Sequence, residues 1–136
     1  MTGEEIADLE LPPYAQSLGM FVERFEGDVP LIACEASDLV LGRPGFWHGG
    51  VIAGLLEIAA LSAIRSALGI DGNRLKPVNI TVQFMRSATM QRAYAIGTIE
   101  RAGRRLVNVT ASAWQEDRAK HIAGAQMTVL LAPEDG

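Results

Sequence analysis

The chain has 136 residues, of which 49 % are hydrophobic and 21 % are charged. This composition excludes a disordered chain, and the length predicts one domain covering residues 1–136. The formal net charge of −4 argues against nucleic acid as the main partner. Cys34 is the only cysteine, so an intrachain disulfide and a cysteine-based metal site are excluded, and a buried, inert thiol is expected.

Residues 1–18 are predicted to form a peripheral N-terminal segment with a short turn of helix near Tyr14. This end of the chain is acidic and lacks the apolar stretch of a signal peptide, so we expect a cytoplasmic protein. Two strands are expected next, at 19–26 and 29–37, joined by a Gly-Asp turn.

A long helix is predicted from about Gly49 to Leu68, ended by Gly69. It is apolar on almost every face, so neighbouring structure must cover it nearly all round. Glu57 and Arg65 lie within it, and their charges argue against a membrane span.

Four further strands are expected after the helix, at 78–86, 91–100, 104–116 and 119–131. The first alternates apolar and polar residues with the period of two that a strand requires. The breaks between the four are short enough for hairpins, which predicts a meander. The predicted fold class is therefore α+β, with one long central helix wrapped by a curved antiparallel sheet of about six strands.

Glu57 is the one acidic residue in this helix. Its helical neighbours are Ala53, Gly54, Ala60 and Leu61, none of which can pair with a carboxylate. An unpaired carboxylate in apolar surroundings requires a raised pKa, a partner from elsewhere or a water-filled pocket. A structural glutamate, either paired with a distant arginine or exposed on a narrow polar stripe, is one interpretation. A catalytic carboxylate is the other, because the small neighbours leave space for a ligand.

Gly49 and Gly50 open the helix, although glycine is a poor helix former. The first turn of a helix carries unpaired N–H groups and partial positive charge, and a residue without a side chain lets a ligand oxygen approach them. Tight packing against a strand is the alternative. Together with the acid two turns further on, the pair suggests donors and a carboxylate that flank one reactive carbonyl.

The stretch His48-Gly49-Gly50-Val51-Ile52-Ala53-Gly54-Leu55-Leu56-Glu57 resembles the signature of hotdog-fold acyl-CoA thioesterases of the PaaI type. This family includes phenylacetyl-CoA and 4-hydroxybenzoyl-CoA thioesterases. Residues 78–88 and 101–105 resemble strands that follow the helix in the family. The resemblance implies a hotdog fold, a homodimer or homotetramer, active sites at the subunit interface, and an acyl-CoA or aryl-CoA substrate, with no metal and no cofactor besides the coenzyme A of the substrate.

The resemblance also implies the roles of individual residues. The Gly49 N–H would polarise the thioester carbonyl, and Glu57 of the partner chain would act as general base or as nucleophile. His48 would shape the turn, with Gly50 beside it. A hydratase on the same scaffold is disfavoured, because those enzymes pair an Asp with a His five residues later, where this chain has Ser62.

Other residues are weaker candidates for substrate binding. Phe46 and Trp47 are expected to line an acyl pocket or to pack in the core. The arginines expected to hold the phosphates of coenzyme A, with a solvated hairpin tip as the alternative for the last two, are Arg86, Arg104 and Arg105.

Gly42 departs from the family pattern, since many relatives carry Asn or Gln six residues before the histidine. A second polar position of some relatives falls near Pro77, and Asn79, Thr81 or Gln83 is expected to replace the missing polar group. These departures keep open a non-catalytic acyl-CoA binding or regulatory module. The identity of the acyl group is not predicted.

Overall fold

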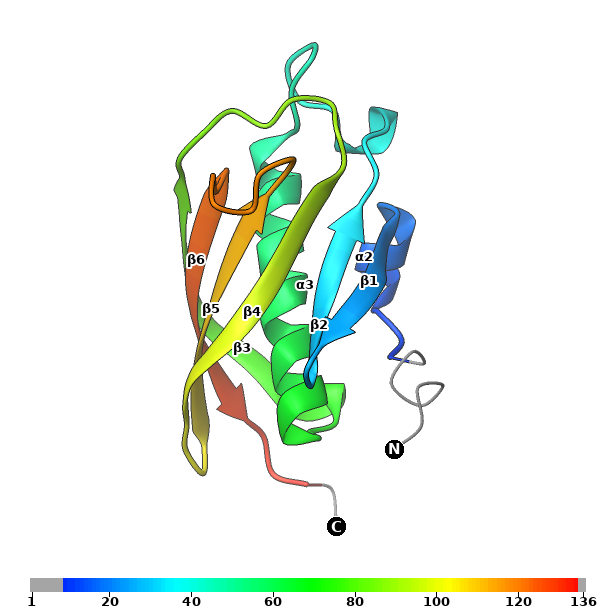
Figure 1. Ribbon diagram of the computed structural model, residues 1–136. Coiled ribbons are helices and arrows are strands. Elements are labelled where there is room, and N and C mark those ends of the chain that lie inside the picture. Colours follow the sequence, from blue (N-terminus) through cyan, green and yellow to red (C-terminus); the bar gives the residue numbers. More distant parts are fainter. Residues whose placement is uncertain (1–8, 135–136) are drawn as a thin grey trace.

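The computed structural model describes residues 9–134 (Figure 1). In chain order, the elements are α2 (Pro13–Ser17), β1 (Met20–Glu26), β2 (Val29–Cys34), the 3-10 turn η1 (Asp38–Val40), α3 (Gly49–Leu68), the 3-10 turn η2 (Gly72–Arg74), β3 (Leu75–Phe84), β4 (Ala93–Ala102), β5 (Leu106–Trp114) and β6 (Ala123–Leu131).

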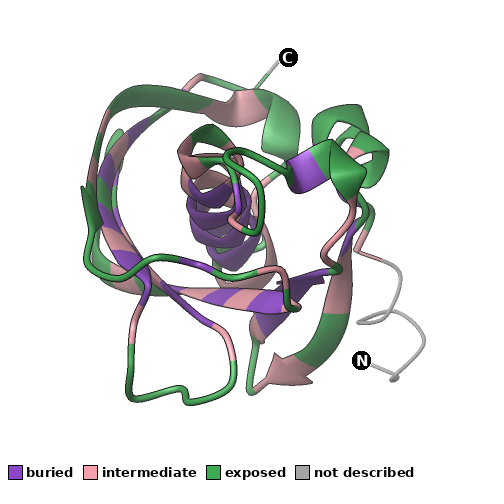
Figure 2. Cartoon of the chain, turned by 90° about the horizontal axis from the view of Figure 1, so that it is seen from above, coloured by how far each residue is buried: buried purple, intermediate pink, exposed green. Residues whose placement is uncertain are grey.

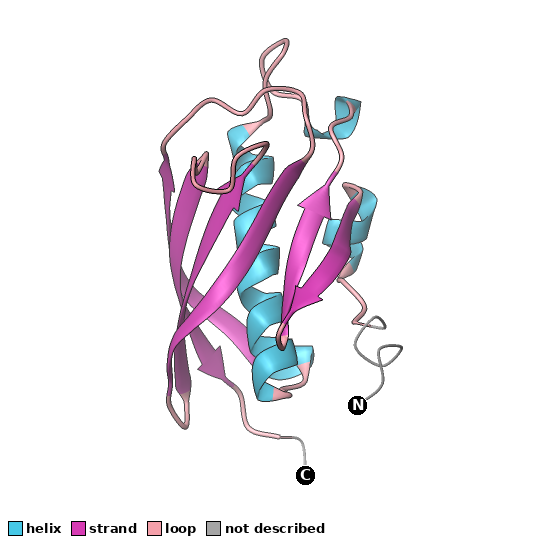
Figure 3. Cartoon of the chain, viewed as in Figure 1, coloured by secondary structure: helices cyan, strands magenta, loops and turns pink. Residues whose placement is uncertain are grey.

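The six strands of the described chain form one antiparallel sheet in the order β1-β2-β4-β5-β6-β3. The sheet curves around α3, and the buried residues lie where helix and sheet face each other (Figures 2 and 3). The prediction of one central helix wrapped by a curved antiparallel sheet is confirmed.

The predicted meander of four strands is wrong in one respect. β4, β5 and β6 are neighbours joined by hairpins, but β3 pairs with β6 and forms the opposite edge of the sheet from β1. The connection 85–92 therefore crosses from one side of the sheet to the other. On its way it holds the residues before α3, because the Trp47 N–H donates to the Ala88 carbonyl at 2.9 Å and Phe46 forms a β-bridge with Thr89.

α3 has the predicted bounds. It begins at Gly49 after His48, and Gly69 follows its end with a φ of 63°, a conformation that glycine adopts without strain. By length and composition α3 is apolar enough to cross a membrane. Its apolar side chains, among them Leu55 and Leu56, are buried against the sheet, so packing accounts for this composition.

The N-terminal segment was expected to be peripheral, and residues 9–18 differ from that expectation. Leu11 and Ala15 are buried and belong to the hydrophobic core. α2 lies close to β1 and α3, and its buried residue is Ala15. The two prolines before Tyr14 begin this short helix. Residues 1–8 of this predicted segment lie outside the described residues.

Cys34 is buried, as predicted, and its Sγ donates to the Leu18 carbonyl at 3.3 Å. Burial and, to a smaller extent, the nearby charge of Glu35 together raise the pKa of this thiol to about 11. The thiol is therefore protonated and inert at neutral pH.

Gly97 of β4 sets the distance between the sheet and α3. A Cβ at this position would lie 2.8 Å from the Ala59 carbonyl oxygen and 2.9 Å from the Ala63 Cβ. Helix backbone cannot move away as a flexible side chain can, so any side chain here separates α3 from β4.

We predict that Gly97→Ala lowers the free energy of unfolding by about 1–3 kcal/mol through this overpacking. Urea unfolding measures the change. Thr98→Ala, at the exposed neighbouring position, is the control and should cost less than about 1 kcal/mol. Equal stability of wild type and Gly97→Ala would show that the helix and sheet are not in tight contact.

Candidate active site

The first turn of α3 leaves one backbone donor free. The N–H groups of Val51 and Ile52 donate to the His48 carbonyl at 3.0 and 3.3 Å, and the Gly50 N–H donates to the His48 Nδ1 at 2.9 Å. No group within residues 9–134 accepts a hydrogen bond from the Gly49 N–H. Of the two predicted donors, therefore, Gly49 is the one available to a ligand, and it carries the positive end of the helix dipole.

His48 caps the helix. Its ring lies over Gly50, where a Cβ would approach the imidazole to 3.0 Å, so the second glycine makes room for the cap. Because Nδ1 accepts the Gly50 hydrogen bond, this nitrogen carries no proton. The interaction agrees with the role of shaping the turn that the sequence resemblance implied for His48.

Gly42 packs against the same turn. Its N–H donates to the Phe46 carbonyl at 2.9 Å, and a Cβ would lie 2.8 Å from the His48 Cα. No polar side chain fits here unless the backbone before α3 moves. The departure from the family pattern at position 42 therefore has a steric cause.

Gly49 lines a cavity of about 360 Å³. Trp47 is buried in its wall and its Nε1 donates to the Gln91 carbonyl at 3.0 Å. Phe84 of β3 lies beside Gly49, because a Cβ added at Gly49 would be 3.6 Å from the Phe84 ring, an ordinary van der Waals distance. The remaining residues at this cavity include Arg43, Phe46, Met85 and Arg86. The structure thus brings three predicted substrate-binding residues, Phe46, Trp47 and Arg86, to Gly49.

Glu57 is half-buried at a second cavity of about 300 Å³. α3 forms its floor with Gly50, Ala53 and Gly54, and Ile80 and Val82 of β3 form one wall. Within residues 9–134 no basic side chain forms an ion pair with Glu57. The sequence left open a raised pKa, a partner from elsewhere or a water-filled pocket for this carboxylate. Within the described residues, Glu57 lies beside an accessible cavity, which fits the third of these.

Tyr14 of α2 forms the other wall of the Glu57 cavity, and the sequence did not identify it. Its ring packs on Gly54, where a Cβ would lie 2.9 Å from the Tyr14 Cζ. Burial, the charge of Glu57 and, to a smaller extent, Cys34 raise the pKa of the Tyr14 hydroxyl. Gly54, a glycine inside a helix three residues before the acid, was the available signal that another group approaches there.

The remaining predicted residues lie elsewhere in the chain. Asn79 is on the outer face of the sheet beside Glu100 and Asn108, away from Glu57. Arg104 and Arg105 are exposed in the hairpin between β4 and β5. Figure 1 shows this hairpin at the end of the sheet opposite to the start of α3. Among residues 9–134, no three His, Cys, Asp or Glu side chains cluster as metal ligands would.

Comparison with known proteins agrees with this geometry. Residues 44–122, more than half of the chain, match the family model of the thioesterase superfamily. The chain belongs to the thioesterase superfamily. The matched range contains the His48-Gly49-Gly50 turn, Glu57 and the strands β3 to β5, whereas Tyr14 lies outside it.

Individual relatives share a low sequence identity with this chain. The medium/long-chain acyl-CoA thioesterase YigI of Escherichia coli is 26 % identical, over 88 % of this chain and 85 % of the relative. Two solved structures share the fold. A phenylacetic acid degradation-related protein from Ralstonia eutropha JMP134 has a TM-score of 0.78 at 22 % identity, covering 94 % of this chain and 97 % of its own. The zebra fish thioesterase superfamily member 2 has a TM-score of 0.76 at 19 % identity, covering 96 % and 93 %. The predicted hotdog fold is confirmed.

We predict that His48→Ala lowers the free energy of unfolding by about 0.5–2 kcal/mol, because the Gly50 N–H loses its acceptor. Thermal or urea unfolding measures the loss. His48→Asn keeps an acceptor near the Gly50 N–H and is expected to retain most of the stability. If the alanine and asparagine variants are equally destabilised, the cap is not the reason.

A second prediction concerns alkaline pH. The pKa of Tyr14 in the folded chain is raised above its ordinary value of 10.0, so the folded state holds this proton more tightly than the unfolded state. The resulting stability is complete below pH 10 and is lost as the pH rises through the folded pKa. Between these limits, the unfolding free energy of the wild type should fall more steeply with pH than that of Tyr14→Phe. Parallel curves for the two proteins would refute this coupling.

Proposed function

We propose that this protein is an acyl-CoA thioesterase that hydrolyses its substrate to a carboxylic acid and free coenzyme A. It acts as a homodimer in the cytoplasm, and the hydrolysis needs no metal. Membership of the thioesterase superfamily supports the reaction class. The observation that carries the proposal is the pairing, on one helix, of a free N–H at Gly49 with a carboxylate at a cavity, Glu57.

The Gly49 N–H supplies the electrophilic half of the reaction. A thioester carbonyl oxygen that accepts this hydrogen bond lies on the axis of α3, where the partial positive charge of the helix is greatest. Negative charge develops on that oxygen when the carbonyl carbon is attacked, so the donor stabilises the transition state more than the substrate.

Glu57 supplies the nucleophilic half. As a general base, its carboxylate takes a proton from water while the water oxygen bonds to the carbonyl carbon. The tetrahedral intermediate then expels the sulfur, and the proton on Glu57 passes to the departing thiolate. Direct attack by the carboxylate would instead break the C–S bond, release the coenzyme A thiolate and form an anhydride, which water hydrolyses to the carboxylic acid and free Glu57 in a second step.

Gly49 and Glu57 of one chain cannot act on the same carbonyl group. Eight residues separate them, and at 1.5 Å per residue they lie about 12 Å apart along the helix axis. A reacting carbonyl needs its donor and its base within hydrogen-bond range. A complete site therefore combines Gly49 of one chain with Glu57 of a second chain whose α3 runs in the opposite direction.

The edge strand β3 is the surface for this second chain. It presents Val78 and Phe84 to solvent, with Met85 directly after it, and these side chains are 63 %, 57 % and 54 % exposed. The other edge, β1, carries the charged residues Glu23 and Arg24, which discourage pairing. Apolar residues on an open edge favour a partner, and β3 also borders both cavities, so a chain that pairs there reaches the site. A tetramer would be built from two such dimers.

Coenzyme A is proposed to lie at the Gly49 end. Arg43 and Arg86 flank the cavity beside Gly49, and Arg is suited to bidentate phosphate binding. The hairpin residues Arg104 and Arg105 lie at the far end of the same chain. They would contact this coenzyme A only from a second chain related by a two-fold axis, which brings opposite ends together.

We predict that Glu57→Gln and Gly49→Pro each lose thiol release. Glu57→Gln removes the base and should cost about 100-fold to 10,000-fold, and Gly49→Pro removes one oxyanion donor and should cost about 100-fold or more. Proline is tolerated as the first residue of a helix, and the extended backbone of His48 suits the position before it. Co-expression of the two variants should restore activity, because a mixed dimer contains one intact site.

The controls for this complementation are Glu57→Gln alone and Gly49→Pro alone, each expressed separately and assayed at the same total concentration. Size-exclusion chromatography checks that each remains a dimer. A mixture no more active than its parents would reject a site that combines Gly49 of one chain with Glu57 of another, and wild-type rates in Glu57→Gln would reject the catalytic role.

Gly42 favours a second candidate, a non-catalytic acyl-CoA binding module. The polar side chain that many relatives place there has no room in this chain. Tight binding of acyl-CoA by calorimetry, with no thiol release from any acyl-CoA or aryl-CoA, would support this function over hydrolysis.

A further inference from the structure

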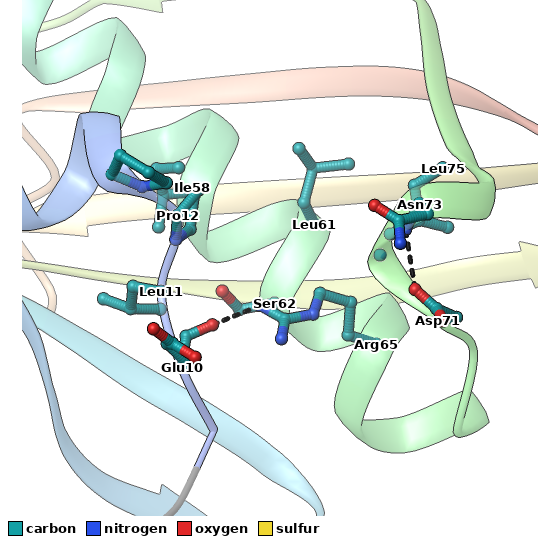
Figure 4. A pocket seen from close by; sticks show the side chains of 12 residues that line it. Glu10, Leu11, Pro12, Ile58, Leu61, Ser62, Arg65, Asp71, Asn73 and Leu75 are labelled. Atoms are coloured by element: carbon teal, nitrogen blue, oxygen red, sulfur yellow. Dashed lines mark hydrogen bonds between the residues drawn. The ribbon is translucent and has the colours of Figure 1, made fainter.

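A third cavity, of about 410 Å³, follows the Glu57 cavity along α3. Ile58 and Leu61 lie on its floor, directly after Glu57 and one helical turn beyond it, and Ser62 and Arg65 continue the floor (Figure 4). A group bound to the carbonyl carbon at Glu57 therefore meets this cavity first when it extends toward the end of α3.

The two cavities lie between the same two walls. One wall is the N-terminal segment, with Tyr14 at the Glu57 cavity and Leu11, Pro12 and Pro13 at the larger one. The other wall is β3, whose first residue, Leu75, borders the larger cavity. The wall residues and the floor near Glu57 are mainly apolar, which suits a hydrocarbon and not a phosphate or a sugar.

Charged and polar groups close the far end. The Arg65 guanidinium donates to the Glu10 carbonyl at 2.8 Å, and Asp71 Oδ1 accepts from the Asn73 N–H at 2.9 Å. Gly72 lies beneath the Arg65 side chain, where a Cβ would be 3.3 Å from Nε. Figure 4 shows Arg65 with Glu10 on one side and Asp71 on the other. Arg65 and Asp71 both lie at this end, so a charged ligand terminus of either sign would meet a like charge as well as an opposite one.

We infer that this cavity holds the tail of an uncharged acyl group of medium length. The inference rests on the proposed thioesterase function and narrows its substrate class. From Glu57 to Arg65 is eight residues, about 12 Å along the helix, which sets the length of the tail. Its end lies against the alkyl stem of Arg65, while the guanidinium stays at the rim.

This assignment differs from the prediction that Phe46 and Trp47 line the acyl pocket. They lie at the Gly49 cavity with Arg43 and Arg86, on the side that the coenzyme A portion occupies. Leu61, Pro13 and Leu75 take their place as the residues that contact the acyl group.

The test measures the binding of S-alkyl coenzyme A thioethers, which cannot be hydrolysed, by calorimetry. In the wild type, affinity should rise about fourfold per methylene from S-ethyl to S-octyl and then level off, as each buried methylene contributes until the tail reaches Arg65. Leu61→Trp fills the near part of the cavity and should weaken S-octyl binding by about tenfold or more, with S-ethyl binding unchanged. An analogue ending in a carboxylate should bind more weakly than S-octyl.

Gly72→Leu is the second variant and narrows only the far end, at an exposed position. This variant should weaken the binding of the longest thioether that the wild type accepts and leave S-ethyl binding unchanged. It therefore tests the position of the tail if Leu61→Trp does not fold. Leu39→Trp, exposed on η1 and outside the lining of this cavity, is the matched control and should bind every analogue as the wild type does.

Affinity that does not depend on tail length, or equal weakening of S-ethyl and S-octyl by Leu61→Trp, would overturn the inference. So would a higher kcat/KM for phenylacetyl-CoA than for octanoyl-CoA. The two proposals fail separately. Length-dependent binding without any thiol release would reject hydrolysis and keep the pocket, whereas thiol release with length-independent binding would reject the pocket alone.

Discussion

The distance between Gly49 and Glu57 on one rigid helix is the constraint on which the rest of this protein depends. An α-helix has a fixed rise per residue, so the two groups cannot approach each other by any side-chain movement that leaves α3 intact. Under the proposed mechanism, each chain would therefore contribute two half-sites. The proposal of a second chain rests on this distance, and the apolar residues on the open edge strand β3 offer the surface on which that chain would lie.

Small residues determine how closely other elements approach this helix. Gly97 brings β4 against the backbone of α3, Gly54 accepts the ring of Tyr14, and Gly42 fits beneath the turn before the helix. Each contact involves backbone or a packed ring, which a larger residue would displace. The wall of the Glu57 cavity and the position of the free N–H both follow from these contacts.

Several parts of the fold followed from local pattern. The bounds of α3 were predictable because a helix covered on all sides must be apolar on all sides, and because glycine marks its end. Hairpins between β4, β5 and β6 were predictable from short breaks. The place of β3 was not, since the residues 85–92 that link it to β4 are compatible with either a hairpin or a crossing. Only the closure of a curved sheet around α3 puts β3 beside β6.

The sequence by itself determined the candidate catalytic pair, since the spacing of Gly49 and Glu57 and the absence of a helical partner for the acid are properties of the chain alone. Tertiary structure decided what surrounds the pair. Tyr14 and Leu61 are 47 residues apart in the sequence and no periodicity connects them, yet they border adjoining cavities on α3. Local pattern reports which face of an element is apolar, but the neighbour that covers this face depends on contacts between distant segments, and those exist only in the folded chain.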